Sequence, residues 1–261
     1  MRQFGDDVDF GLTANDYAIH RAGFPPSFFS LLKSQHYAKA GQIAVDLGTG
    51  TGTVARGLAQ LGLEVTGLDP SESLLAEARA LDLNTSVNIN YQIGTAEQTG
   101  LATGSFDLVT AGQCWHWFDR GNAANEVVRL LRPGGRIIIA HFDWLPLSGN
   151  VVDATEALIL QYNPAWVGAG GSGLYPAWLT DLAGAGFQEL ETTSFDSVQC
   201  YSHVAWRGRI RASAGIAASL NAKDTKEFDA ELAELLRMCF PEDPLKIPHR
   251  VWLATGVTSE R

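Results

Sequence analysis

The stretch Val45-Asp46-Leu47-Gly48-Thr49-Gly50-Thr51-Gly52 decides the fold class of this 261-residue chain. It joins an apolar run at 43–47 to a helix-forming segment at 54–61 through three glycines spaced two apart. A strand that turns into a helix through glycine lets a ligand lie against bare backbone, because no Cβ blocks the approach. The helix N-terminus adds unpaired N–H groups and a partial positive charge. This stretch predicts a nucleotide-type site at the first β-to-α crossing of an α/β sheet.

The glycine spacing disfavours a dinucleotide. The pyrophosphate fingerprint requires G-x-G-x-x-G or A, whereas Thr53 stands at the third small position and Gly52 comes one residue early. Asp46, at the strand end, would repel a pyrophosphate. A ligand with a carboxylate, an amine and a sulfonium fits better, because helix N–H groups can bind the carboxylate and Asp46 can face the ammonium, directly or through water. The loop therefore predicts S-adenosylmethionine (SAM).

A second strand, at 63–68, ends in Asp69-Pro70-Ser71. Asp69 follows Gly48 by about the 20 residues at which a doubly wound fold places the carboxylate for the ribose hydroxyls. Pro70 ends the strand, and Ser71 can cap the next helix. Alone, Asp69 would be an ordinary turn carboxylate. The glycine loop one β-α unit upstream favours ribose binding.

The central part of the chain alternates strands and helices, which predicts a parallel sheet. Strands are expected at 43–47, 63–68, 88–93, 106–111 and 136–141, and helices at 53–61, 72–81 and 120–131. A helical segment at about 14–37 precedes them.

The remainder of the chain is less regular. Residues 145–175 carry a glycine run and predict a mobile loop or lid. A helix at 176–184, a strand at 188–196, an amphipathic helix within 203–245 and a last strand at 249–255 follow.

The composition limits the classes of partner. The net charge is −10, which opposes docking on nucleic acid or on an anionic membrane. No apolar run is long enough to span a bilayer, and the acidic N-terminus does not resemble a signal peptide. The three cysteines form no C-x-x-C pair, so no metal site is expected. A cytoplasmic protein, monomeric or homodimeric, is the expectation.

Six motifs together resemble the class I SAM-dependent methyltransferases, in particular the small-molecule branch with the ubiquinone/menaquinone C-methyltransferase-like and trans-aconitate methyltransferase-like enzymes. The resemblance runs from about Tyr17 to Gly256. The motifs are Val45–Gly52, Gly67–Ser71, Gly94–Glu97, Ser105–Val109, Gln113–Asp119 and Leu131–Gly135.

The resemblance implies a Rossmann-like α/β fold with a seven-stranded, mostly parallel sheet, helices on both faces and an antiparallel last strand. It also implies a single domain over 1–261. Its parts would be a core at about 38–144, 176–200 and 246–257, an N-terminal helical lid at 10–37, and a helical cap from insertions at 145–175 and 203–245.

The resemblance also assigns the cofactor site. Gly48 and Gly50 would border the methionine part of SAM and Asp69 would hold the ribose. Residues 95–97 would contact the adenine, although Thr95 stands where the family often has Asp. Gln113 would lie near the sulfonium. The predicted cofactor-binding residues are Tyr17, Arg21, Asp46, Gly48, Thr49, Gly50, Asp69, Pro70, Thr95, Ala96, Glu97 and Gln113.

Two histidines are candidate catalytic residues. His116 follows the fourth expected strand within Trp115-His116-Trp117-Phe118, where the reactive methyl group is expected. His141 ends the fifth strand beside Asp143. Methyl transfer mainly requires alignment, and a base is needed only if the acceptor loses a proton. A positioning role, or a hydrogen-bonded loop histidine, remains the alternative.

Arg207, Arg209 and Arg211 alternate in an otherwise acidic chain. In an extended segment all three would point one way and could bind an acidic acceptor; in a helix they would spread around the surface.

The predicted activity is methyl transfer from SAM to a small organic acceptor by direct displacement, releasing S-adenosylhomocysteine. A short-chain reductase is disfavoured, because no tyrosine has a lysine four residues later. A SAM-binding protein without methyl transfer, either a regulator or a SAM-independent catalyst, remains the alternative.

Overall fold

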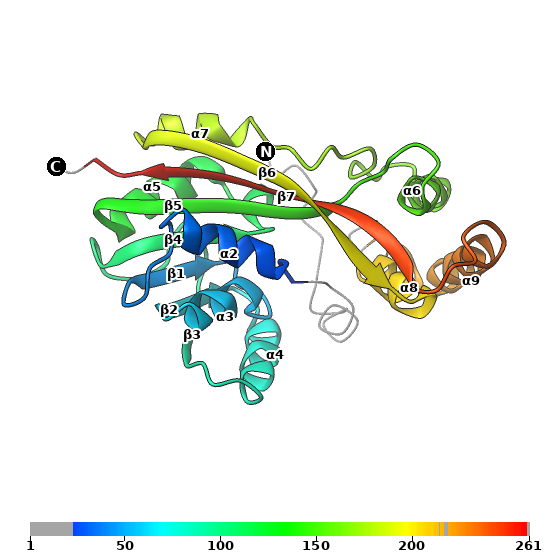
Figure 1. Ribbon diagram of the computed structural model, residues 1–261, viewed down its shortest axis with the longest axis horizontal. Coiled ribbons are helices and arrows are strands. Elements are labelled where there is room, and N and C mark those ends of the chain that lie inside the picture. Colours follow the sequence, from blue (N-terminus) through cyan, green and yellow to red (C-terminus); the bar gives the residue numbers. More distant parts are fainter. Residues whose placement is uncertain (1–22, 214, 217–218, 260–261) are drawn as a thin grey trace.

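A computed structural model describes residues 23–213, 215–216 and 219–259. Its centre is a seven-stranded sheet in the order β3-β2-β1-β4-β5-β7-β6 (Figure 1). The strands are β1 (Ile43–Leu47), β2 (Glu64–Asp69), β3 (Ile89–Ile93), β4 (Phe106–Gly112), β5 (Leu131–Trp144), β6 (Gln188–Tyr201) and β7 (Leu245–Val257). Strand β7 runs antiparallel to β5 and β6, and the other pairs are parallel. The predicted sheet, with its antiparallel last strand, is confirmed.

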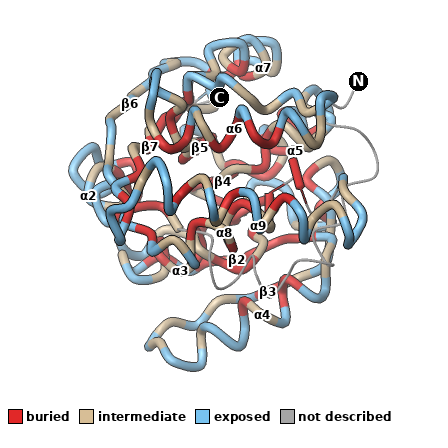
Figure 2. The backbone as a smooth tube through the Cα atoms, turned by 90° about the vertical axis from the view of Figure 1, so that its right-hand side faces the viewer, coloured by how far each residue is buried: buried red, intermediate tan, exposed pale blue. Residues whose placement is uncertain are grey.

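Helices cover both faces of the sheet, because successive strand residues point to opposite faces. Val45 belongs to one buried cluster with residues of α5 (Arg120–Leu130) and α7 (Trp178–Gly184). Its neighbour Ala44 belongs to another, with residues of α2 (Pro26–Ser34) and α3 (Thr53–Gln60). Figure 2 shows buried strand segments in red in the middle of the molecule, with exposed helix surfaces in pale blue outside them.

Several helices start at a polar residue whose side chain accepts a hydrogen bond from a backbone N–H of the first turn. Ser71 accepts the Leu74 N–H at the start of α4 (Glu72–Asp82), as expected from the sequence. Asp119 caps α5 in the same way through the Asn122 N–H. These caps fix where the chain leaves β2 and β4, and therefore position the loops at that edge of the sheet.

Strands β5, β6 and β7 continue beyond the core and carry a helical cap, which Figure 1 shows as α6, α8 and α9 at the far end of these strands. The cap contains α6 (Val151–Tyr162), α8 (His203–Arg211) and α9 (Ala222–Cys239), which share a buried cluster with the ends of these strands. It lies at the carboxyl ends of β5 and β6, the same edge of the sheet as the glycine loop.

The expectation of a loop throughout 145–175 is wrong for its central part, which is helix α6. Val152, Thr155 and Ile159 are buried and follow helical spacing, and the Asn150 side chain caps the first turn. The glycine run that suggested a loop begins only at Gly168, after the helix has ended.

Across the described ranges, every helix is too short or too polar to cross a lipid bilayer.

Candidate cofactor and acceptor site

The glycine loop between β1 and α3 has a left-handed backbone at each of its three glycines. The φ angles are +59° at Gly48, +55° at Gly50 and +77° at Gly52, and glycine adopts this region without the penalty that a Cβ brings. A Cβ at Gly48 would lie 2.9 Å from the Cβ of Cys114, whereas one at Gly50 would meet nothing within 4 Å. The loop is therefore packed on one side at Gly48 and open at Gly50.

Asp46 lies beneath this loop with 1% of its surface exposed. Its carboxylate accepts hydrogen bonds from the hydroxyls of Thr49, at 2.7 Å, and Thr110, at 2.6 Å. Burial raises the pKa of Asp46 to about 6, although these bonds oppose the rise. The carboxylate thus ties the loop to β1 and β4, and its contact with a cofactor ammonium stays a prediction.

Asp69 ends β2 and links the next strand to the same loop. One carboxylate oxygen accepts the Gly50 N–H and the other accepts the Ser71 N–H, both at 2.9 Å. Burial raises the pKa of this carboxyl group. A carboxylate offers roughly four acceptor positions, so two backbone bonds leave capacity for a pair of ligand hydroxyls. Its neighbour Pro70 is exposed.

The predicted adenine contacts lie in a turn beside Asp69. The Gly94 N–H donates to the Asp69 carbonyl at 3.2 Å, and Thr95 pairs with Gln98 across the turn. Ala96 is buried, whereas Thr95 is exposed. The carboxylate of Glu97 accepts the Asp119 N–H at 2.8 Å and so joins this turn to the start of α5.

Gln113 follows β4 and has a left-handed backbone with φ of +59°. Its N–H donates to the Ala140 carbonyl and its side-chain amide donates to the Phe142 carbonyl, both at 2.8 Å. A left-handed conformation is uncommon for a residue with a side chain. These two bonds to β5 hold the strained residue at the carboxyl edge of the sheet.

The structure brings both predicted catalytic histidines together. Nδ1 of His116, in the 3-10 helix η2 (Trp115–Trp117), lies 3.3 Å from Nε2 of His141 on β5. Nδ1 of His141 lies 3.3 Å from Oδ2 of Asp143, and the Tyr175 hydroxyl donates to that same oxygen at 2.6 Å. Four side chains from three segments thus form one hydrogen-bonded chain.

Aromatic rings enclose the buried end of this chain. Tyr175 stacks on Trp178 with ring centroids 4.2 Å apart, and His141 lies 4.8 Å from Trp178. Burial alone would raise the pKa of Asp143, but the attraction of the His141 ring in its protonated form and the hydrogen bonds from His141 and Tyr175 lower it to about 2. Asp143 is therefore ionised at neutral pH.

The arginine row does not form an extended binding strip. Its segment is helix α8, in which Arg207 and Arg211 both pair with Asp229 of α9. The guanidinium of Arg209 lies over the ring of Trp144 at 4.7 Å. The extended alternative is therefore wrong, and two of the three arginines join cap helices to each other.

Two predicted cofactor residues, Tyr17 and Arg21, lie outside the described residues. Tyr175 and Thr110 contribute to the site but were not predicted. Tyr175 follows the glycine run of an insertion, and Thr110 is one of many strand threonines, so neither stands out in the sequence.

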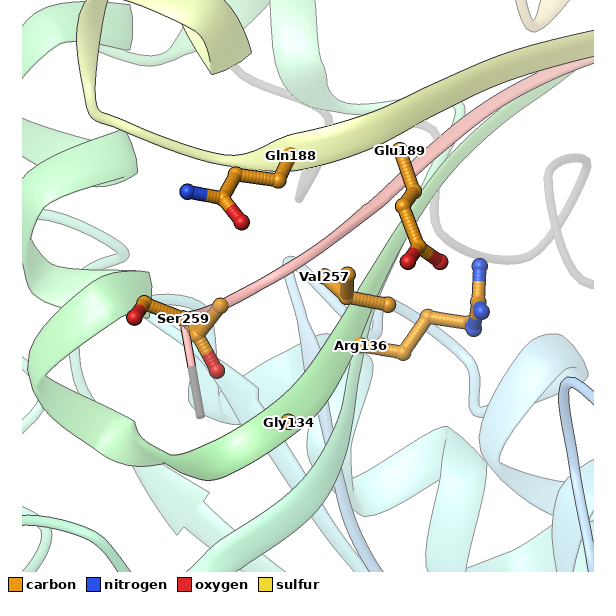
Figure 3. A pocket seen from close by; sticks show the side chains of 7 residues that line it. Gly134, Arg136, Gln188, Glu189, Val257 and Ser259 are labelled. Atoms are coloured by element: carbon orange, nitrogen blue, oxygen red, sulfur yellow. The ribbon is translucent and has the colours of Figure 1, made fainter. Parts of the chain in front are cut away.

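An open pocket of about 800 Å³ lies at the other end of the sheet, near the start of β5 (Figure 3). Figure 3 shows Glu189 and Arg136 facing each other across it. Its lining residues are Gly134, Arg136, Gln188, Glu189, Val257, Thr258 and Ser259. It shares no residue with the glycine loop or the histidine chain.

The central region of the chain is similar in sequence to known methyltransferases. Residues 45–139 match a family model described as a methyltransferase domain. This match runs from β1 into β5. The chain is similar to an uncharacterized methyltransferase of Mycobacterium tuberculosis, with 37% identity over 130 residues that cover 50% of this chain and 50% of that protein. A ubiquinone biosynthesis O-methyltransferase of Pseudomonas aeruginosa is 36% identical over 127 residues, 48% of this chain and 55% of that protein.

The chain therefore spans about half the length of the curated relatives it matches. A solved structure from Anaeromyxobacter dehalogenans, assigned as a type II methyltransferase, resembles the whole fold with a TM-score of 0.67 and 24% identity. That likeness covers 92% of this chain and 99% of the other. The predicted resemblance to methyltransferases is confirmed over residues 45–139, and SAM is the cofactor that this resemblance implies.

Proposed function

We propose that this protein transfers a methyl group from SAM to a small organic acceptor. The observation that carries the proposal is a hydrogen bond between the glycine loop and the end of β2. The Gly50 N–H donates to the buried carboxylate of Asp69 at 2.9 Å. It combines an open stretch of backbone with a carboxylate that retains acceptor capacity. Those two features fit the amino-acid end and the ribose of SAM.

The residues of the loop divide the binding between them. The N–H groups at the start of α3 suit a carboxylate, because they are unpaired within the helix and carry its positive end. Asp69 is placed to accept the ribose hydroxyls, and the turn at 95–97 lies beside it for the adenine. When bound, SAM supplies a methyl group on a positively charged sulfur. The chain contributes alignment of the acceptor and exclusion of water.

The acceptor would bind between this edge of the sheet and the helical cap. The cap rests on extensions of β5, β6 and β7 and so overhangs the end of β5, where His141 and Asp143 lie. A single domain of core, N-terminal lid and cap would enclose a small molecule. The net charge of −10 disfavours a nucleic-acid acceptor.

The test is calorimetric titration with SAM, followed by incubation with SAM and a panel of small hydroxyl, thiol and amine compounds. Release of S-adenosylhomocysteine that depends on one class of acceptor supports the proposal. Micromolar SAM binding without transfer to any member of the panel would favour the alternative, a SAM-binding protein without methyl transfer. Absence of SAM binding would overturn both.

A further inference from the structure

The geometry points to a proton relay in which His116, His141, Asp143 and Tyr175 take a proton from the acceptor during methyl transfer. The acceptor group would then be a hydroxyl of phenolic or enolic type. This inference rests on the proposed function and adds to it the role of four side chains and the class of acceptor.

The hydrogen bonds fix the tautomers along the chain. Asp143 is ionised and can only accept, so the nearby Nδ1 of His141 must be the donor at 3.3 Å. A neutral His141 then has its lone pair at Nε2, which accepts from Nδ1–H of His116 at 3.3 Å. The basic nitrogen of a neutral His116 is consequently Nε2.

Burial separates the residue that would touch the acceptor from those that act through it. His141 is 4% exposed and is enclosed by Tyr175 and Trp178. His116 is only partly buried and belongs to the short helix that follows β4, on the cofactor edge. His116 is therefore the catalytic residue, and His141, Asp143 and Tyr175 are positioning residues.

The acceptor proton passes through His116 to His141 as the methyl group is transferred. The acceptor O–H bond breaks and its proton goes to Nε2 of His116, while Nδ1–H of His116 passes to Nε2 of His141. The oxygen lone pair forms the new O–CH₃ bond, and the pair of the broken S–CH₃ bond stays on sulfur, which becomes a neutral thioether. His141 ends as an imidazolium beside the Asp143 carboxylate. Water removes the extra proton after the product leaves.

The basicity of the imidazole limits which acceptor groups the relay can deprotonate. An imidazole of pKa about 6.5 can take a proton from a phenol-like group of pKa about 10 in the transition state. An aliphatic alcohol is a far weaker acid and would remain protonated.

Other charged groups near the relay have partners of their own. Arg250, which lies opposite Asp143 in the register of β5 and β7, pairs with Asp196. Asp181 of α7 accepts from Trp115 Nε1 at 3.1 Å and lies 3.6 Å from Arg120 of α5. On β7, burial lowers the pKa of His249 to about 4, so it is neutral near pH 7. Asp143 is therefore the carboxylate that sets the tautomer of His141.

The first test is nitrogen NMR of protein labelled with ¹⁵N-histidine, which reads the tautomer of each ring without any acceptor. The wild type should show Nδ1–H at both His141 and His116, assigned from single His→Gln variants. In Asp143→Asn the amide can donate to Nδ1 of His141, which should reverse both tautomers. The control Asp107→Asn changes a carboxylate at the opposite end of the sheet, where Asp107 bonds the Ile43 N–H and Arg132. A wild-type His141 protonated at Nε2, or a reversal that does not reach His116, would overturn the relay.

The second test uses SAM with phenol and with 4-nitrophenol, which is mostly ionised at about pH 8.5, whereas phenol is not. Asp143→Asn should lower kcat for phenol by about 10²–10⁴-fold and lower it far less for 4-nitrophenol, with SAM affinity unchanged. Tyr175→Phe should reduce kcat for phenol by a smaller factor in the same direction. An equal loss for both phenols, or no transfer to either by wild-type protein that binds SAM, would overturn the inference. Absence of SAM binding would instead overturn the proposed function. The NMR experiment would still test the tautomers of the relay, because it needs neither SAM nor an acceptor.

Discussion

The backbone N–H of Gly50 and the carboxylate of Asp69 are joined by a hydrogen bond of 2.9 Å across 19 residues of sequence. The bond connects the loop after β1 to the end of β2, so two motifs that are separate in the sequence form one surface. The Ser71 N–H, at 2.9 Å from the other carboxylate oxygen, fixes the orientation of Asp69 from the opposite side.

Gly48→Ala and Gly50→Ala form a matched pair, because both glycines have left-handed backbones. Each substitution should cost about 1–2 kcal/mol for that conformation. Gly48→Ala adds a contact of 2.9 Å with the Cβ of Cys114, which should bring its total loss of unfolding free energy to about 2–5 kcal/mol. Gly50→Ala should fold well but weaken SAM binding at least about tenfold, since its methyl group enters the open side of the loop.

Urea unfolding and calorimetric titration of both variants check this pair. Equal losses of stability would contradict the packing at Gly48, and unchanged SAM affinity in Gly50→Ala would contradict the position of the cofactor.

Asp46 should make the stability of the wild type depend on pH. Its pKa is about 6 in the folded protein and 3.8 in the unfolded chain, so the folded state binds more protons between these values. The free energy of unfolding should therefore fall by roughly 3 kcal/mol as the pH rises from about 4 to about 7. Asp46→Asn cannot titrate and lacks this contribution.

The comparison is made by urea unfolding of wild type and Asp46→Asn at several pH values. The difference in stability between them should shift in favour of the variant as the pH rises, whichever is more stable at the start. A difference that does not vary with pH would show that the carboxyl group of Asp46 titrates normally.

Asp229→Asn tests the join between cap helices α8 and α9. Asp229 accepts from both Arg207 and Arg211, and its loss leaves two guanidinium groups without that carboxylate. The expected cost is about 1–2 kcal/mol, which corresponds to a fall in Tm of about 2–8 °C. Amide hydrogen exchange should increase within 203–211 and 222–239.

Glu234→Gln provides the control on the same helix, because its ion pair with Arg237 is exposed. Its Tm should match that of the wild type. Faster exchange in the control, or none in Asp229→Asn, would show that the Asp229 pair does not hold the cap.

The sequence predicted the central fold well where local chemistry and topology agree. The glycines at 48, 50 and 52 predicted the turn from strand to helix, where each has a left-handed backbone, and Ser71 caps the helix that it was expected to cap. The extent of the long strands could not be predicted. Strand β5 begins at Leu131 and passes through Pro133 and two glycines, which in a sequence indicate a turn.

The acceptor side of the site was predicted only in part. His116 and His141 were predicted individually, but their 3.3 Å contact depends on how β4 and β5 align in the sheet. Tyr175 reaches Asp143 from a loop 32 residues away, a distance over which the sequence carries no periodic signal. Likewise, α8 was ambiguous, because arginines at alternate positions fit either an extended or a helical segment.

The most direct test of the central claim is calorimetric titration of the full chain with SAM, for the wild type and for Asp69→Ala. Asp107→Ala is the control, because it removes a carboxylate at the opposite end of the sheet, where Asp107 bonds the Ile43 N–H and Arg132. Micromolar binding to the wild type and the control, with a loss of at least about tenfold in Asp69→Ala, is the predicted result. No binding of SAM to the wild type, with binding of NADH in its place, would contradict the account.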